Sequence, residues 1–156
     1  MIPISPLQLK QHLFTEISVR AFEKGSAEAA ASFEPAVLCE RFAPLANHWR
    51  LGLVIKLKSA NPDKPLRYEA EVGIQGLVEV NSGFPEEKRE QLAFVNGLSL
   101  LYSAVREILL TVTGRCVHGP MCLPTLNFGE VFAGWNAGGE KNETHDERRD
   151  APASKE

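Results

Sequence analysis

The sequence predicts an α+β fold in which antiparallel strands come first and a long helix follows. Apolar and polar residues alternate in several runs before residue 80, and such alternation is typical of strands with one buried face. Beyond residue 98 the apolar spacing changes to that of an amphipathic helix. A polar, glycine-containing stretch ends the chain. These observations predict one domain over residues 1–135 and a tail over residues 136–156.

The first predicted strand lies in "LQLKQHLFTEISVRAF", where apolar and polar residues take alternate positions. The apolar Phe14 breaks this alternation. We expect "EKGSAEAAAS" to be a connection and "AVLCERF" to be a short second strand. The apolar set expected on the buried face of the first strand is Leu7, Leu9, Leu13, Ile17 and Val19.

Two longer alternating runs, "HWRLGLVIKLKS" and "LRYEAEVGIQGLVEV", predict the next strands. The segment between them, "ANPDKP", has the residues of a turn that joins antiparallel neighbours. On the polar face of the later run, Glu69, Glu71 and Glu79 form either a docking surface or a solvated face interspersed with Arg67.

The long helix is predicted to begin after Pro85, with two glutamates in its first turn, and to end near Gly114. Its apolar stripe is wide, because Leu100, Ala104 and Leu110 extend it around the cylinder. One sheet cannot cover such a stripe, so we expect a second subunit to do so. The main stripe comprises Leu98, Leu101, Tyr102, Val105, Ile108, Leu109 and Val112.

The segment "CLPTLNFGEVF" is unusually apolar for a stretch so close to the end of the chain. It could fold back to complete the core, or it could form a partly exposed patch that binds another molecule. We expect a short helix from Phe128 to Trp135. The polar residues 136–156 cannot bury enough apolar surface to fold, so they are expected to be disordered.

Composition and charge narrow the function further. The chain has 156 residues, 44% of them hydrophobic, and a formal net charge of -3 without a basic block, which argues against nucleic-acid binding. No secretory signal and no run of 18 apolar residues is present, so we expect a cytoplasmic protein that does not insert into membranes. Three cysteines, Cys39, Cys116 and Cys122, are an odd and sparse set that suits reduced thiols.

Candidate chemistry is sparse. Cys116, His118 and Cys122 form C-x-H-x3-C, which has the residue types of a zinc site but only three ligands. The remaining histidines, His12, His48 and His145, are scattered and suggest no catalytic constellation. We therefore predict no enzyme activity, no metal and no cofactor.

The ordered set of motifs in "LLYSAVREILLTVTGRCVHGPMCLPTLNFGEVF" resembles the C-terminal signature of the SecB export chaperones. Upstream, "YEAEVGIQGLVEV" with "FPEE" is similar to the last strand of that family and its exit, and "FTEIS" is similar to its first strand. The resemblance covers roughly residues 7 to 135. It implies a four-stranded antiparallel sheet packed against one long helix, with a short C-terminal helix, assembled as a homotetramer that is a dimer of dimers. The signature residues are Arg106, Glu107, Arg115, Pro120, Leu123, Asn127, Phe128 and Phe132.

The resemblance also implies a function, which is to bind unfolded or precursor polypeptides in apolar grooves without ATP and to pass them to the translocation motor SecA. Glu16 and Glu71 match two acids that face SecA in the family, whereas Arg20 and Glu69 depart from its pattern. Gly129 replaces the usual aspartate and removes a capping side chain. The positions that match the groove walls are Tyr68, Ile74, Leu101, Tyr102, Leu126 and Phe128.

Other functions stay open. A SecB-like chaperone could serve a narrow cytosolic client, such as an aggregation-prone antitoxin. A hot-dog thioesterase also combines antiparallel strands with a long helix, but that class places the helix between strands and carries a catalytic carboxylate, so we rank it below the chaperone. A purely structural interaction module is the third possibility.

Overall fold

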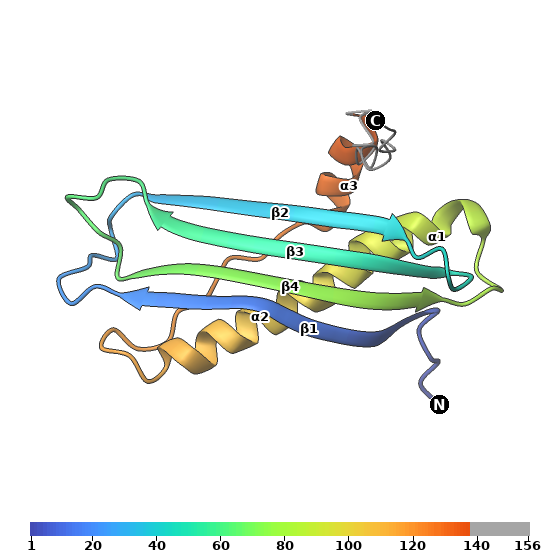
Figure 1. The fold of residues 1–156 in the computed structure, drawn as a ribbon, viewed down its shortest axis with the longest axis horizontal. Helices are drawn as coiled ribbons and strands as arrows, with labels where there is room; N and C mark the ends of the chain where they lie inside the picture. The colour runs from blue at the N-terminus through green and yellow to red at the C-terminus, as the bar shows by residue number, and fades with distance from the viewer. Residues whose placement is uncertain (138–156) are drawn as a thin grey trace, which may run out of the picture.

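A computed structural model describes residues 1–137 and confirms the predicted α+β fold. One face of a four-stranded sheet is covered by a long helix that crosses it diagonally (Figure 1). The remaining residues of the predicted tail, His145 among them, lie outside this description. The elements are β1 (Leu7–Ala21), β2 (Ala31–Arg41), β3 (His48–Ser59), β4 (Tyr68–Val80), α1 (Glu86–Leu92), η1 (Ala93–Gly97), α2 (Leu98–Thr113) and α3 (Phe128–Ala137).

The sheet has the strand order β1-β4-β3-β2 and is antiparallel throughout, so β1 and β2 form its edges. β2 begins at Ala31, earlier than the predicted "AVLCERF", because residues 31–35 already pair with residues 55–59 of β3. The strand also contains Pro35, which has no N–H to donate to a ladder. An edge strand tolerates that loss, and β2 is such a strand.

β1 contains two register shifts that the sequence pattern did not reveal, one after Leu9 and one after Phe14. Each shift reverses which face a following side chain occupies. Phe14 therefore lies opposite the buried Ile74 on the helix side, which explains the break in the alternation. The prediction that Leu13 is a core residue was wrong, since its side chain lies on the other face and is 46% exposed.

The core lies between the sheet and the long helix and contains the alternate apolar residues of β3 and β4. Leu101 of α2 packs so closely on β4 that a Cβ added to Gly76 would lie 2.8 Å from its Cδ2 atom. The glycine thus permits this approach. The fully buried core side chains include Leu51, Leu53, Ile55, Val72, Ile74, Val78, Val80, Phe94, Leu98, Leu101, Val105 and Leu109.

The helical stretch from Glu86 to Thr113 is continuous through the π-helical turn η1. By length and composition alone it could cross a membrane, but a core helix of a soluble protein passes the same test. The sheet covers only one side of α2, as the wide stripe indicated. On the opposite side, Leu100 and Leu110 are 44% and 38% exposed.

Candidate functional site

The second part of the segment that joins α2 to α3, residues 120–127, is called the strap here. It runs back behind the sheet from the far end of α2 towards α3 (Figure 1). Met121, Cys122 and Pro124 of the strap form hydrogen bonds with Thr113, Arg106 and Tyr102 of α2, in that order. The N–H of Met121 donates to Oγ1 of the buried Thr113 at 2.7 Å, and the Tyr102 hydroxyl donates to the Pro124 carbonyl at 2.5 Å. The strap is therefore antiparallel to α2.

The turn before the strap is tied to the sheet by Tyr68. The Tyr68 hydroxyl donates to the Gly119 carbonyl at 2.7 Å and accepts from the N–H of His118 at 3.2 Å. Nε2 of His118 lies 2.6 Å from the carbonyl oxygen of Phe22, just beyond β1. Gly119 has a φ of 73°, a conformation that glycine adopts without strain. One end of the strap is thus fixed.

The other end of the strap leads into α3, where Asn127 supplies the helix cap. Its Oδ1 accepts from the N–H of Gly129 at 3.1 Å and from that of Glu130 at 3.4 Å. This corrects the expectation that Gly129 leaves α3 without a capping side chain. α3 then packs on η1, since the Phe132 and Trp135 rings lie 5.2 and 5.6 Å from the Phe94 ring.

Five of the six predicted groove residues are buried in the protomer, and Leu126 is partly buried. Ile74 and Leu101 lie within the core, and Tyr68 lies at the fixed end of the strap. Tyr102 and Phe128 meet edge to face at the α3 end, with ring centroids 5.9 Å apart. The structure therefore brings Tyr102 and Phe128 together but places Tyr68 apart from them.

Partly exposed apolar side chains from three elements pack against the same core and form what we call the apolar rim. Phe33 was missed because the sequence placed the start of β2 too late, whereas Val37 lies within the predicted strand. The rim comprises Phe33 and Val37 of β2, Met121 and Leu126 of the strap, and Phe132 of α3. Each of these side chains packs on the core and is partly exposed, and such side chains can contact extended apolar chains.

The three residues of the C-x-H-x3-C motif have separate partners. Cys116 Sγ donates to the Val112 carbonyl, and Cys122 Sγ accepts from Arg106. Nε2 of His118 contacts the carbonyl oxygen of Phe22. Within residues 1–137, no group of His, Cys, Asp or Glu side chains could hold a metal ion. All three cysteines are free thiols, and burial raises the pKa of Cys39 to about 12.

The outer face of the sheet carries the predicted acids, and several of them are paired with bases. Glu71 lies 2.7 Å from Nζ of Lys56, and Glu79 lies 2.6 Å from Nζ of Lys10. These hydrogen bonds lower the pKa of both carboxyl groups. Glu16 lies on the same face of the neighbouring strand β1, opposite Gly73. The acids thus sit within a nearly balanced set of charges.

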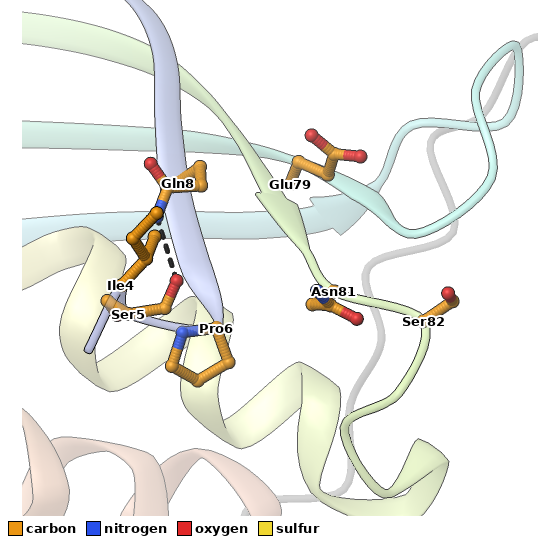
Figure 2. Close-up of a pocket in the computed structure, with 7 residues that line it drawn as sticks. All are labelled: Ile4, Ser5, Pro6, Gln8, Glu79, Asn81 and Ser82. Atoms are coloured by element: carbon orange, nitrogen blue, oxygen red, sulfur yellow. Dashed lines mark hydrogen bonds between the residues drawn. The ribbon is translucent and has the colours of Figure 1, made fainter.

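Two shallow hollows lie away from the strap. Figure 2 shows the first, where the chain before β1 meets the end of β4. There the Gln8 amide donates to the Ser5 carbonyl at 2.8 Å. The second lies between β1, β3 and β4 and includes Arg20, Lys58 and Glu71. Neither hollow contains a predicted groove residue. The first is lined by Ile4, Ser5, Pro6, Gln8, Glu79, Asn81 and Ser82.

The fold just described is shared with a SecB-like chaperone. The solved structure is that of Rv1957 from Mycobacterium tuberculosis, a SecB-like chaperone in complex with a ChAD peptide from the Rv1956 HigA1 antitoxin. The match has a TM-score of 0.58 and 16% sequence identity, and it covers 77% of this chain and 90% of that one. At this identity the match establishes a common fold.

A protein of unknown function from Streptococcus agalactiae also matches, with a TM-score of 0.44, 15% identity and coverage of 76% of this chain and 97% of that one. No protein-family model matches this chain, and no curated protein matches it significantly in sequence.

Proposed function

We propose that this protein is a SecB-like chaperone that binds unfolded polypeptides without ATP and does not act as an enzyme. The main support is the fold match across 90% of a SecB-like chaperone that was solved with a peptide bound. The apolar rim adds support from this chain itself, because it offers partly exposed apolar side chains beside an edge strand. Such a surface suits extended chains with little sequence specificity.

Two kinds of client fit this proposal, namely precursor polypeptides destined for SecA and a narrow cytosolic client such as an antitoxin. The paired acids on the outer face favour the second kind. Lys56 and Lys10 offset the charges of Glu71 and Glu79, which weakens the field that would attract a basic partner. A pulldown from a cytoplasmic lysate, probed for SecA and for precursors, separates the two.

The proposed activity is tested by the aggregation of a chemically denatured client after dilution, without nucleotide. We expect wild-type protein at a stoichiometric ratio to suppress light scattering. Leu126→Ser should suppress it several-fold less, because a partly exposed apolar contact at the strap is lost. Leu45→Ser is the matched control, since Leu45 is an exposed leucine outside the rim. A folded wild-type protein that leaves aggregation unchanged would refute the proposal.

The hot-dog thioesterase stays a weaker alternative. In this chain the long helix follows all four strands, and the residues that α2 buries against the sheet include leucine and tyrosine rather than a carboxylate. Hydrolysis of acyl thioesters at an ordinary enzymatic rate would reverse this order.

A further inference from the structure

We propose that the strap competes with the client from within the protein, and that clients bind by displacing Leu123 from the site that it fills in the core. This inference rests on the proposed chaperone function and describes how access to the same site is regulated. The strap has the features of a bound extended peptide. It forms neither a helix nor a strand, and its apolar side chains pack against the core.

The side chains of the strap alternate between the core and the solvent, as those of an extended chain do. Leu123 is 4% exposed and is the buried residue of the strap, whereas its neighbours Cys122 and Pro124 are exposed. Met121 and Leu126 are partly buried. Leu123 therefore makes the main apolar contact that holds the middle of the strap on the core.

The main chain of the strap is held weakly between its two fixed ends. Within residues 1–137, no backbone–backbone hydrogen bond involves residues 120–126. The middle is held instead by the Tyr102 hydroxyl, which donates to the Pro124 carbonyl, and by the Cys122 thiol, a weak acceptor from Arg106. The strap can therefore lift without unpairing a β-ladder.

An extended client can reproduce the contacts that the strap gives up. One of its main-chain carbonyls can accept the Tyr102 hydroxyl in place of Pro124, and burial raises the pKa of Tyr102, so the hydroxyl stays a donor. An apolar side chain of at least leucine size can fill the site of Leu123. These contacts need only a carbonyl and an uncharged side chain, so they select no particular sequence.

Competition by the strap lowers the apparent affinity for every client. While Leu123 fills its site, only a fraction of the protein can bind, and the apparent dissociation constant rises by the reciprocal of that fraction. Leu126 lies next to Asn127, which caps α3, so it stays in the apolar rim when the middle of the strap lifts. It therefore remains a client contact, whereas Leu123 does not become one.

The first test measures, by anisotropy, the affinity for an uncharged fluorescent peptide of leucine, phenylalanine, proline and serine. Leu123→Ala should raise the affinity about tenfold, because truncating a buried leucine weakens the docking of the strap. Leu7→Ala is the matched control. It truncates another buried leucine, on the edge strand opposite β2, and should leave the affinity unchanged.

The second test follows the strap directly, so it holds even if Leu123→Ala fails to fold. Leu123→Cys is combined with serine at Cys116 and Cys122, and alkylation of the new thiol is followed by mass spectrometry, which separates it from the buried Cys39. The thiol should react slowly in the free protein, because position 123 is buried. Saturating peptide should speed its alkylation several-fold.

The outcomes separate this inference from the proposed function. A lower or unchanged affinity in Leu123→Ala would overturn the inference, since it indicates that Leu123 is a fixed wall of the site. Alkylation at position 123 that peptide slows or leaves unchanged would overturn it as well. Both results leave the chaperone proposal intact. If wild-type protein neither binds the peptide nor suppresses aggregation, the proposed function fails and the inference fails with it.

Discussion

At the scale of single residues, Thr113 joins the strap to the long helix. Its hydroxyl donates to the Leu109 carbonyl at 2.6 Å and accepts from Met121, although the side chain is fully buried. Thr113→Val keeps the shape but leaves the Met121 N–H unpaired, which should lower the free energy of unfolding by about 1–3 kcal/mol. Urea denaturation measures this loss. Thr111→Val makes the same change at an exposed site of α2 and should have little effect.

The ion pair between Glu71 and Lys56 makes the stability of the protein depend on pH, and the directions of the two pKa shifts give the sign of that dependence. The hydrogen bond lowers the pKa of Glu71 below its ordinary value of 4.5, so its contribution to stability is present above that pH and is lost as pH falls through the lowered pKa. The same bond raises the pKa of Lys56 above 10.5, and this contribution is lost only as pH rises through the raised pKa. Both groups are exposed to solvent, so the effect is small and is screened by salt.

We therefore expect Glu71→Gln to lower the urea midpoint slightly at pH 7 and to lower it less at pH 3, because the wild-type carboxyl takes up protons as the pH falls through its lowered pKa. Glu28→Gln is the control, because Glu28 lies outside the ion pairs described above. A midpoint that drops equally at both pH values would show that the substitution acts through packing and not through charge.

Single residues were the least predictable part of the site. The family resemblance assigned Tyr102, Leu126 and Phe128 to groove walls, but the sequence could not distinguish a groove wall from a core side chain, because both need the same residue types. Asn127 was recognised as part of a motif, but its capping bonds depend on the path of the strap. The partly buried state of Phe33 depends in turn on elements distant in sequence.

At the scale of elements, the sequence predicted β3, β4 and the long helix well, because each has an unbroken period and a buried face. β1 has the same composition, but its two register shifts reverse the pattern, and a bulge leaves no reliable mark in one sequence. The start of β2 was hidden by Pro35, which usually argues against a strand. The edge position that permits this proline became visible only in the sheet order.

Gly97, the last residue of the π-helical turn η1, packs closely against Leu51 of β3. A Cβ added to Gly97 would clash with Cδ1 of the buried Leu51, so Gly97→Ala forces that side chain or the helix to shift. We expect the free energy of unfolding to fall by about 1–3 kcal/mol. Gly134→Ala in α3 is the control, since a Cβ there meets nothing within 4 Å and should stabilise the helix by up to about 1 kcal/mol. Thermal unfolding of both variants checks the contrast.

At the scale of the whole molecule, the exposed and partly exposed apolar side chains lie on three separate surfaces. The strap and α3 carry the apolar rim, the outer sheet face carries Leu13 and Leu38 among paired charges, and the outer side of α2 carries Leu100 and Leu110. We propose that clients bind to the surface formed by the strap and α3. The outer side of α2 is the side that the wide apolar stripe predicted a second subunit to cover.

We propose the homotetramer that the family resemblance implies, and its test lies on α2 and not at the strap. Leu100→Glu with Leu110→Glu places charge on both exposed leucines without entering the core, so folding should be kept while subunits separate. Light scattering coupled to size-exclusion chromatography should give a tetramer for wild-type protein and a smaller species for the double variant. Leu13→Glu with Leu38→Glu, on the outer face of the sheet, is the matched control and should keep the wild-type mass. If wild-type protein is a monomer, or if both double variants have the same mass as wild type, α2 is not the assembly surface.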